Sequence, residues 1–288
     1  MSGEIIDGKL IANYYREQLK EKISDLSTSG IVPGLAVILV GDNHASHTYV
    51  KMKRKACSKL GIHSELYQYD DGLTEDQLLD KIRELNNQDH IHGILVQLPL
   101  PKQINPITVI ETISPSKDVD GFHPVSIGKM VTNQDTFYSC TPFGIMKMLE
   151  YENISIEGKH VVILGRSNIV GKPSGHLFLN RNATVTFCHS KTENIPYYTR
   201  QADILVSAVG KANLIDAGDI KEGAIVIDVG MNRDDEGNLC GDVNFSKVKE
   251  KASRITPVPG GVGPMTITML LYNTVKSAEW ALANRKNG

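Results

Sequence analysis

Short apolar runs alternate with amphipathic stretches along most of the chain. The apolar runs are rich in β-branched residues, as in LAVILV at 35–40 and VVIL at 161–164. Between them, apolar residues recur at helical spacing opposite charged ones, as in residues 9–29 and 74–87. Continuous apolar runs are typical of strands buried on both faces of a parallel sheet, which needs helical crossovers. The pattern therefore predicts an α/β protein.

The predicted elements follow from these two periods and from the residues that bound them. The expected strands are residues 35–40, 64–68, 94–96, 161–164, 183–188, 202–210 and 223–230. The expected helices are residues 9–29, 46–60, 74–87, 106–113, 143–151 and 265–282, with a further helix beginning past Gly171. Ser46, Thr74 and Thr141 are expected as N-caps, and residues 114–130 are expected to form a loop.

The segment 159–192 has the most distinctive pattern: an apolar strand, a glycine-bearing turn, a helix and a second strand. Such a unit places the backbone N–H groups of a helix N-terminus against a diphosphate. The turn, GRSNIVG at 165–171, lacks the middle glycine of the usual GxGxxG motif. A strand–helix turn without a ligand therefore stays an alternative on this motif alone.

The second strand of this unit ends without an acid. A carboxylate at that tip normally holds the ribose 2′-hydroxyl of NAD. Here His189, Ser190 and Lys191 follow the strand, the first carboxylate is Glu193, and Arg166 adds positive charge in the preceding turn. The sequence therefore predicts a 2′-phosphate at this place, and hence NADP.

Two places in the first hundred residues carry polar side chains that could bind a ligand: the pair Tyr49 and Lys53, and Gln97. Tyr49 and Lys53 lie four residues apart on one face of the expected helix, although a solvated basic helix explains most of its cations. Gln97 stands where the strand 94–96 gives way to a loop, and ligands collect at strand ends in α/β sheets. Both places are candidates for a substrate site.

Two loop segments complete the candidate chemistry. Asp118 and Asp120 resemble the start of a calcium loop, but the later oxygen ligands and the closing Glu are missing, so no metal site is predicted. An acid in such a loop can also simply cap a turn. The run PGGVGP at 259–264 is not expected to form regular structure, and its Gly260-Gly261 pair allows a tight turn or a close approach of backbone to a ligand.

Composition and charge narrow the classes of function. The chain has 288 residues, 41% of them hydrophobic and 22% charged, which suits two domains or one large α/β domain. A net charge of −2 provides no global basic field for nucleic acid or an anionic membrane. No apolar run approaches the ~20 residues of a membrane-spanning helix, and the N-terminus lacks a signal layout, so we expect a cytoplasmic protein. The four cysteines form no CxxC pair, which argues against a zinc site and a disulfide framework.

Taken together, seven segments resemble one family, the bifunctional methylenetetrahydrofolate dehydrogenase/methenyltetrahydrofolate cyclohydrolases of the bacterial type. The segments are YVKMK at 49–53, VQLPLP at 96–101, KDVDG at 117–121, CTP at 140–142, GRSNIVGKP at 165–173, HSKT at 189–192 and PVPGGVGP at 257–264. They follow the family's order over essentially the whole chain.

The resemblance implies an α/β fold of two α/β domains, the second a Rossmann-type parallel sheet, with a cleft between them. The folate-binding catalytic domain would consist of residues 1–140 plus 265–288, and the NADP-binding domain of residues 141–264. The resemblance also implies a homodimer.

The resemblance implies roles for individual residues as well. Lys53 matches the catalytic lysine, Gln97 the glutamine that orients it, Tyr49 the tyrosine that stacks on the folate, and Asp120 the acid that binds the pterin ring. The implied substrate-binding residues are Tyr49, Gln97, Leu98, Asp120, Pro259, Gly260, Gly261 and Val262. The implied cofactor-binding residues are Gly165, Arg166, Ser167, Val170, Gly171, His189, Ser190, Lys191, Thr192, Val209 and Gly210.

The implied reactions suit these residues. Oxidation of methylenetetrahydrofolate by NADP requires donor and acceptor to be held together, and hydrolysis of the methenyl product to 10-formyltetrahydrofolate requires proton transfer near neutral pH. Two alternatives are an NADP dehydrogenase of the shikimate or amino-acid type and a catalytically idle nucleotide-binding module. Tyr49 with the PGGVGP run argues against the first, and the set Tyr49, Lys53, Gln97 and Asp120 argues against the second.

Overall fold

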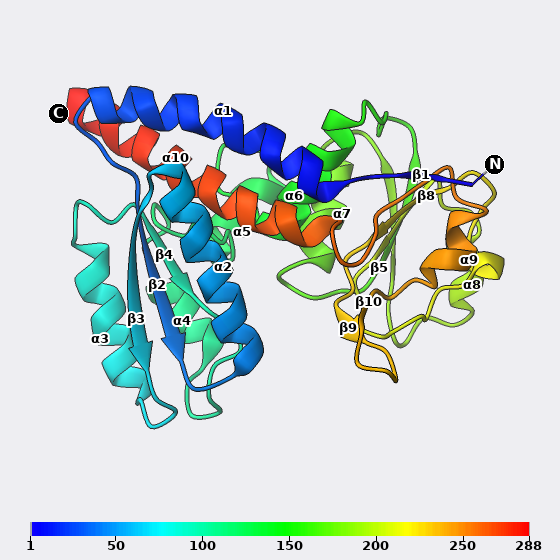
Figure 1. Cartoon of the computed structure of the whole chain (residues 1–288), viewed down its shortest axis with the longest axis horizontal. Coiled ribbons are helices and arrows are strands. Elements are labelled where there is room, and N and C mark those ends of the chain that lie inside the picture. Colours follow the sequence, from blue (N-terminus) through cyan, green and yellow to red (C-terminus); the bar gives the residue numbers. More distant parts are fainter. Residues whose placement is uncertain (1, 288) are drawn as a thin grey trace. The chain divides into compact units, whose positions relative to one another are not determined.

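The structure, a computed structural model, describes residues 2–287, which form two compact units (Figure 1). Unit 1 contains the residues up to Asn13, Met130–Asn133 and Ser139–Thr266. Unit 2 contains Tyr14–Lys129, Gln134–Tyr138 and the residues from Ile267 onward. Helices α1 (Gly8–Thr28), α5 (Pro124–Val131) and α10 (Val262–Asn287) each begin in one unit and end in the other.

The first residues of the chain join the sheet of unit 1. Strand β1 (Glu4–Ile5) pairs in parallel with β11 (Arg254–Ile255) of unit 1, and this pairing draws the first residues into that unit. A strand of two residues leaves no recognisable period, so neither β1 nor β11 could be expected from the sequence.

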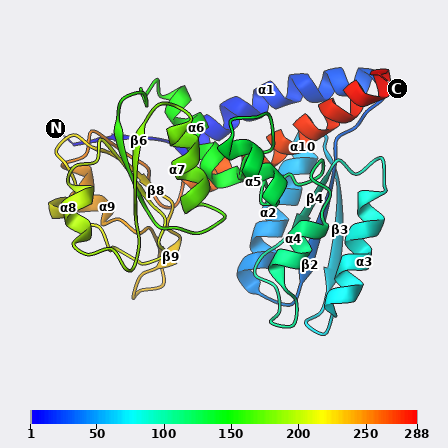
Figure 2. The same ribbon diagram turned by 180° about the vertical axis from the view of Figure 1, so that it is seen from behind.

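Unit 2 is built around a parallel sheet with the strand order β3-β2-β4. Its strands are β2 (Gly34–Val40), β3 (His63–Tyr69) and β4 (Gly93–Val96). Every residue of the central strand β2 is buried, as expected for a strand covered on both faces. Figures 1 and 2 show α2 (His44–Leu60) and α4 (Pro106–Thr112) on opposite faces of this sheet.

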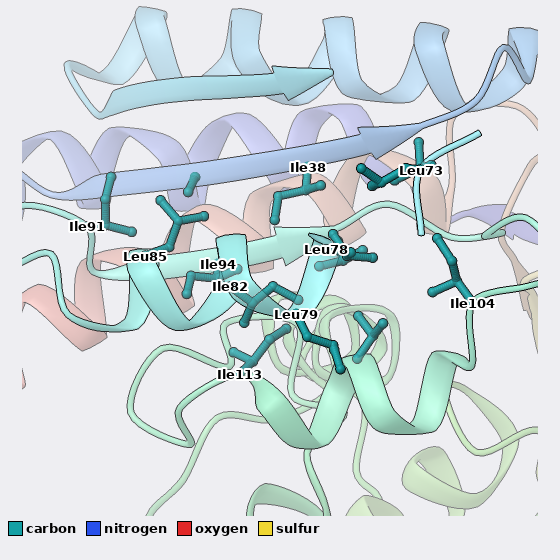
Figure 3. Packing of buried hydrophobic residues seen from close by; sticks show 14 residues of the cluster. Ile38, Leu73, Leu78, Leu79, Ile82, Leu85, Ile91, Ile94, Ile104 and Ile113 are labelled. Atoms are coloured by element: carbon teal, nitrogen blue, oxygen red, sulfur yellow. The ribbon is translucent and has the colours of Figure 1, made fainter. Parts of the chain in front are cut away.

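The core on one face of that sheet comes from helix α3 (Glu75–Asn86) and the strand residues that face it. Leu78, Leu79, Ile82 and Leu85 recur at helical spacing and pack against β2, β4 and α4 (Figure 3). Burial of each such side chain contributes about 1.5–3 kcal/mol. Thr74 caps the start of α3, as predicted, and Gln77 completes a capping box there.

Helices α1 and α10 run side by side within unit 2 (Figures 1 and 2). The Arg16 guanidinium donates to the Thr268 hydroxyl at 2.9 Å, and the Lys22 ammonium lies 2.9 Å from a Glu279 carboxylate oxygen. The part of α10 from Ile267 onward therefore packs against the part of α1 from Tyr14 onward, both within unit 2.

Unit 1 is built around a fully parallel sheet with the strand order β1-β11-β8-β7-β5-β6. The longer strands are β5 (His160–Leu164), β6 (Thr184–Cys188), β7 (Ile204–Ser207) and β8 (Ile225–Asp228). One face packs against α8 (Ile195–Thr199) and α9 (Phe245–Lys249). On the other face lies α7 (Gly171–Leu179), where a Cβ on Gly175 would stand 2.1 Å from the Phe187 ring.

The strand order of unit 1 confirms the predicted Rossmann-type parallel sheet. Strand β5 is followed along the chain by β6 on one side of it and then by β7 on the other. The order therefore reverses at β5, and a crevice forms outside the carboxyl ends of β5 and β7 in such a sheet. A small antiparallel pair, β9 (Asn232–Arg233) and β10 (Leu239–Cys240), stands apart from this sheet.

Two helix starts differ from the prediction. Asn43, not Ser46, caps α2, because its side-chain oxygen accepts from the Ser46 N–H at 3.0 Å. Helix α6 (Cys140–Tyr151) follows Ser139, so the predicted cap Thr141 lies inside its first turn. The Thr141 hydroxyl instead forms a hydrogen bond with that of Thr266 at 2.9 Å. Pro142 was expected to be the first helical residue, but α6 begins two residues earlier. A proline is tolerated at any position of a first turn, because the N–H groups there have no partner within the helix.

One helix was not predicted, and another begins earlier than predicted. Residues 114–130 were expected to form a loop, but helix α5 occupies the end of that segment. Its Pro124 and Gly128 gave the segment a loop-like composition, while Pro in a first turn is compatible with a helix. Helix α10 begins at Val262 rather than after Pro264, for the same reason.

Candidate functional site

The predicted lysine and glutamine meet in unit 2. Lys53 lies on α2 with 8% of its surface exposed, and its ammonium donates a hydrogen bond to Gln97 Oε1 at 3.0 Å. Gln97 follows β4 directly, and its N–H donates to the Ile38 carbonyl at 2.9 Å, which extends the sheet by one residue. Its side-chain amide donates to the Leu98 carbonyl at 2.7 Å, so the oxygen faces the lysine. The pair is thus held by the sheet on one side and by a helix on the other.

Tyr49 precedes Lys53 by one helical turn and is half-buried. Burial raises the pKa of the Tyr49 phenol above its usual value, which keeps the ring neutral. The neighbouring cations Lys51, Arg54 and Lys55 are exposed, as a solvated basic face predicts. Their charges are screened by water, so burial rather than a cationic neighbourhood distinguishes Lys53 from the other lysines of this helix.

Asp118 organises the loop that carries Asp120. The buried Asp118 carboxylate accepts from the Phe122 N–H at 3.1 Å, the His123 N–H at 2.9 Å and the Ser126 hydroxyl at 2.7 Å. Burial raises the pKa of Asp118 to about 6. The turn-capping interpretation is therefore confirmed for Asp118.

Asp120, two residues further on, is only half-buried. It lines a small pocket together with Leu98, Phe122 and the ends of β4 and α4. The same loop is tied to α10, because Asn273 donates to the Val119 carbonyl at 2.8 Å. The structure thus brings Leu98 and Asp120 together at one surface of unit 2.

In unit 1 the predicted cofactor residues all follow the carboxyl ends of β5, β6 and β7. The turn after β5 requires glycine, because Gly165 has φ +126° and a Cβ there would lie 2.4 Å from the Ala208 carbonyl oxygen. A Cβ on Gly171 would lie 2.5 Å from the Gly165 oxygen. The Ser167 hydroxyl accepts from the Val170 and Gly171 N–H groups, both at 3.2 Å, at the start of α7.

The turn after β6 is fixed by its own side chains. The His189 N–H donates to the Thr192 hydroxyl at 2.9 Å, and the Thr192 N–H donates to the His189 carbonyl at 2.8 Å. Ser190 and Lys191 are exposed at the tip, as is Arg166 in the neighbouring turn. A hydroxyl and two cations thus stand on adjacent strand ends where an NAD site would have a carboxylate.

The segment after β7 depends on a residue that the sequence did not single out. The buried Asp242 carboxylate accepts from the Val209 N–H at 2.8 Å, the Lys211 N–H at 2.9 Å and the Ser207 hydroxyl at 3.1 Å. These bonds fix Val209 and Gly210 at the crevice. Because Asp242 lies thirty-odd residues along the chain from these partners, no local pattern in the sequence indicates its role.

A second buried acid, Asp228, accepts a hydrogen bond from the backbone of Asp242. Asp228, the last residue of β8, accepts from the N–H groups of Gly230, Asp242 and Val243, each at 2.9 Å. Burial raises the pKa of Asp228 to about 6, and the Asp242 carboxylate adds to this effect. Asp228 is the one acid at the end of the apolar run IVID, and this position could have marked it as a candidate in the sequence.

The glycine-rich run at the start of α10 belongs to unit 1. Gly260 has φ +106°, and a Cβ on Gly8 would stand 1.7 Å from the Gly261 carbonyl oxygen, so the chain start lies directly against this run. Pro259 is exposed and Val262 is buried. Tyr49, Lys53, Gln97, Leu98 and Asp120 therefore belong to unit 2, and the remaining predicted site residues belong to unit 1.

The other sequence features have modest roles. The four cysteines are free thiols, and three of them are buried, as expected for bystanders. Burial raises the pKa of the Cys57 thiol to about 12, which makes a reactive thiolate there unfavourable. Among the helices of residues 2–287, none has the length and apolar character that crossing a membrane requires.

Comparison with known proteins gives matches over both parts of the chain. Residues 6–120 match the tetrahydrofolate dehydrogenase/cyclohydrolase catalytic domain, and residues 139–282 match the NAD(P)-binding domain of the same family. The bifunctional protein FolD of Bacillus subtilis is 60% identical over 283 residues, which cover 98% of this chain and 100% of that protein.

Solved structures give the same result. The bifunctional enzyme FolD of Campylobacter jejuni has a TM-score of 0.96 at 51% identity, covering 99% of this chain and 100% of that one. The Trypanosoma brucei methylenetetrahydrofolate dehydrogenase-cyclohydrolase, complexed with NADP cofactor and inhibitor, has a TM-score of 0.93 at 37% identity, covering 97% and 98%. From both domain matches and from identity over nearly its whole length, the chain belongs to the tetrahydrofolate dehydrogenase/cyclohydrolase family.

Proposed function

We propose that this protein oxidises methylenetetrahydrofolate with NADP and hydrolyses the methenyl product to 10-formyltetrahydrofolate. The observation that carries the proposal is the buried lysine of unit 2, with its ammonium 3.0 Å from Gln97 Oε1 and Tyr49 one helical turn away. Membership of the family supports the substrate class. The proposal makes the protein an enzyme and sets aside an idle nucleotide-binding module.

Lys53 is the proposed catalytic group of the hydrolytic step. Water adds to the carbon of the methenyl cation, and a carbon–nitrogen bond of the ring breaks. One of the two water protons is released to solvent, and the other must travel from the water to the departing nitrogen. The Lys53 amine takes that proton and returns it, which is general base and then general acid catalysis. Gln97 holds Nζ in place through the 3.0 Å hydrogen bond, since its own orientation is fixed by the Leu98 carbonyl.

Residues around this pair are proposed to bind the folate. The half-buried ring of Tyr49 offers a flat apolar face for stacking on the pterin. The Asp120 carboxylate accepts hydrogen bonds from the amino and amide edge of that ring, and the adjoining Leu98 contributes apolar contact. The run Pro259, Gly260, Gly261 and Val262 is proposed to contact the substrate through its backbone, which a glycine pair permits.

The carboxyl edge of unit 1 is proposed to hold NADP. When bound, NADP supplies the acceptor for the hydride that leaves the methylene carbon. The turn of Gly165, Ser167, Val170 and Gly171 lies at the start of α7, and its glycines leave room for the diphosphate to approach the backbone of a helix N-terminus. The exposed Arg166, Ser190 and Lys191, with the His189 and Thr192 turn, suit a 2′-phosphate, and Val209 and Gly210 line the far side.

The finer organisation also stays a proposal. Residues 1–140 plus 265–288 are proposed as the folate-binding domain and residues 141–264 as the NADP-binding domain. We further propose a cytoplasmic homodimer that does not bind nucleic acid, in keeping with the net charge of −2. Light scattering of the purified chain measures its mass in solution, and a monomer at assay concentration would contradict the dimer.

An assay of both steps in the purified protein tests the proposed function. Methylenetetrahydrofolate with NADP should produce reduced nicotinamide faster than with NAD, and methenyltetrahydrofolate alone should lose its absorbance as the ring opens. No reduction with either nucleotide would contradict the dehydrogenase. Hydrolysis at the uncatalysed rate would contradict the cyclohydrolase.

Cofactor choice can be tested separately at the tip of β6. Lys191→Ala should raise the KM for NADP by roughly tenfold and leave that for NAD nearly unchanged, because only NADP carries the 2′-phosphate. Lys159→Ala is the matched control, since Lys159 is exposed at the opposite, amino end of β5. An equal change for both nucleotides would contradict the assignment of Lys191.

A further inference from the structure

The surface of unit 2 carries a second cluster of side chains that the proposed reaction does not use. His63 and Glu65 lie two residues apart on β3, so their side chains leave the same face of the strand. His90 comes from the segment between α3 and β4. The Nε2 atoms of both histidines lie 2.9 Å from one carboxylate oxygen, Glu65 Oε1. One ligand atom from each residue lies within 4.8 Å of the others.

The scaffold around this cluster is ordered by further contacts. The Tyr67 hydroxyl donates to the second oxygen of Glu65, which fixes the carboxylate. The Lys81 ammonium stands 4.1 Å from the centre of the Tyr67 ring and pairs with Glu84. The backbone of His90 lies against β2, where a Cβ on Gly34 would be 2.0 Å from the His90 carbonyl oxygen. The three groups therefore project from well-supported backbone.

Their chemistry and spacing fit a transition metal. Two imidazole nitrogens and one carboxylate oxygen are ligands that suit zinc, nickel or copper, whereas calcium and magnesium prefer oxygen. Around tetrahedral zinc, with bonds of about 2.0–2.1 Å, neighbouring ligand atoms are about 3.3 Å apart. The two His–Glu separations of 2.9 Å need to grow by only a few tenths of an ångström, and the ligand atoms of the two histidines lie within 4.8 Å of each other. The side chains of His63, Glu65 and His90 are 50%, 26% and 58% exposed, which leaves an approach for the ion.

We propose that His63, Glu65 and His90 form a binding site for a divalent transition metal ion of the zinc type, completed by water. Glu65 bridges the two histidines, and Tyr67 holds it in the way that outer hydrogen bonds orient metal ligands. The bound ion links strand β3 to the segment that enters β4. Binding therefore stabilises unit 2, because the unfolded chain does not hold the three groups together.

Titration calorimetry of the full chain, tag-free and metal-stripped, with zinc chloride tests this site. Cys240→Ser is the parent for all variants, because Cys240 is the partly exposed thiol among the four cysteines. The parent should bind one zinc ion per chain. His63→Ala, His90→Ala and Glu65→Gln should each weaken binding at least about tenfold, and Tyr67→Phe by roughly tenfold. His47→Ala should bind as the parent does, since it removes another surface histidine that lies beside a single acid, Asp42.

Cobalt provides a second readout that is independent of folding defects. The parent loaded with cobalt should show visible absorption bands typical of a nitrogen–oxygen site, and the His63→Ala/His90→Ala double variant should lack them. Zinc should raise the thermal midpoint of the parent and not that of the double variant. Unchanged zinc affinity in the double variant, equal loss in His47→Ala, or no binding by the parent at about millimolar zinc would overturn the proposal.

Discussion

The two candidate sites use the chain in different ways. At the edge of unit 1, the geometry comes from backbone and from glycines such as Gly165 and Gly171, which leave no room for a side chain. In unit 2 the decisive group is a side chain, the buried ammonium of Lys53 held by Gln97. Backbone groups at a strand end are suited to binding a ligand, whereas a buried lysine amine is suited to transferring a proton. The difference predicts that variants of the two regions fail in different assays.

The largest expected effect falls on hydrolysis. Lys53→Met keeps the apolar stem but removes the proton-transfer group, so methenyltetrahydrofolate hydrolysis should slow by about 10²–10⁴-fold. The rate of absorbance loss without nucleotide measures this step. Lys55→Met on the same helix is the control, because Lys55 is exposed and should be replaceable at little cost. Similar rates for both variants would remove the distinction between the buried lysine and its neighbours.

The next effect concerns the glycine turn of unit 1. Gly165→Ala places a Cβ at φ +126° and 2.4 Å from the Ala208 oxygen, so the free energy of unfolding should fall by roughly 2–4 kcal/mol. Nucleotide affinity should fall as well, because the turn moves. Gly218→Ala, at a place open to solvent, should change both quantities little. Denaturant unfolding and nucleotide titration measure the two, and a neutral Gly165→Ala would break the account of this turn.

A smaller effect should follow from the buried acid behind the crevice. Asp242→Asn keeps the shape but replaces one acceptor oxygen with an NH2 group. The N–H groups of Val209 and Lys211 donate to different oxygens of Asp242, so in either orientation the new NH2 group faces one of these donors. The mismatch should cost about 1–3 kcal/mol and weaken NADP binding by roughly tenfold. Asp235→Asn, an exposed acid of the same unit, is the control. Retention of full nucleotide affinity in Asp242→Asn would show that this acid does not position the β7 loop.

The smallest expected effect is a pH dependence that separates the units. Burial, with the charge of Lys117 adding to it, lowers the pKa of His92 in unit 2 to about 4 from 6.5. The folded state then binds fewer protons than the unfolded one between these values, so the contribution of His92 is complete above 6.5 and is lost as the pH falls through 4. Asp228 in unit 1 acts in the opposite direction, because its raised pKa makes its contribution fade as the pH rises through about 6.

The variant His92→Asn isolates the contribution of His92 to the pH dependence of stability. The asparagine oxygen can still accept the Gly34 N–H that His92 Nδ1 accepts at 3.1 Å, but it does not titrate. On acidification through this range, the free energy of unfolding of the parent should fall by roughly 1–2 kcal/mol relative to that of His92→Asn. This is less than the full pKa shift implies, because water screens part of the charge. Parallel unfolding curves for both proteins across this range would contradict the assignment.

Local sequence was enough for the parts whose signal is local. The apolar runs, the glycine turn at Gly165 and the cap at Thr74 each depend on neighbouring residues, and all three are present. The two-residue strands β1 and β11 were missed, because they form only through pairing with strands elsewhere in the chain, β1 with β11 and β11 also with β8. The start of α6 was misplaced, since Thr141 bonds with the distant Thr266 instead of capping.

The same limit applies to the sites. Tyr49 and Lys53 share a helix face and could be paired from their spacing, but the hydrogen-bond partner of Lys53 is Gln97, forty-four residues away. Asp242 could not be distinguished from any loop acid, because its partners Ser207, Val209 and Lys211 lie far along the chain. Family resemblance supplied the roles that spacing could not, and the contacts now give a physical reason for each residue to occupy its place.

Hydride transfer in Lys53→Met tests the division between the two sites most directly. The methylene carbon loses its hydride through the push of the folate nitrogens, so this step needs nucleotide and substrate held together but no proton from the lysine. The account predicts that Lys53→Met still reduces NADP within about tenfold of the parent rate while its hydrolysis is lost. Equal loss of both activities, in a variant that still binds NADP with parent affinity, would contradict it.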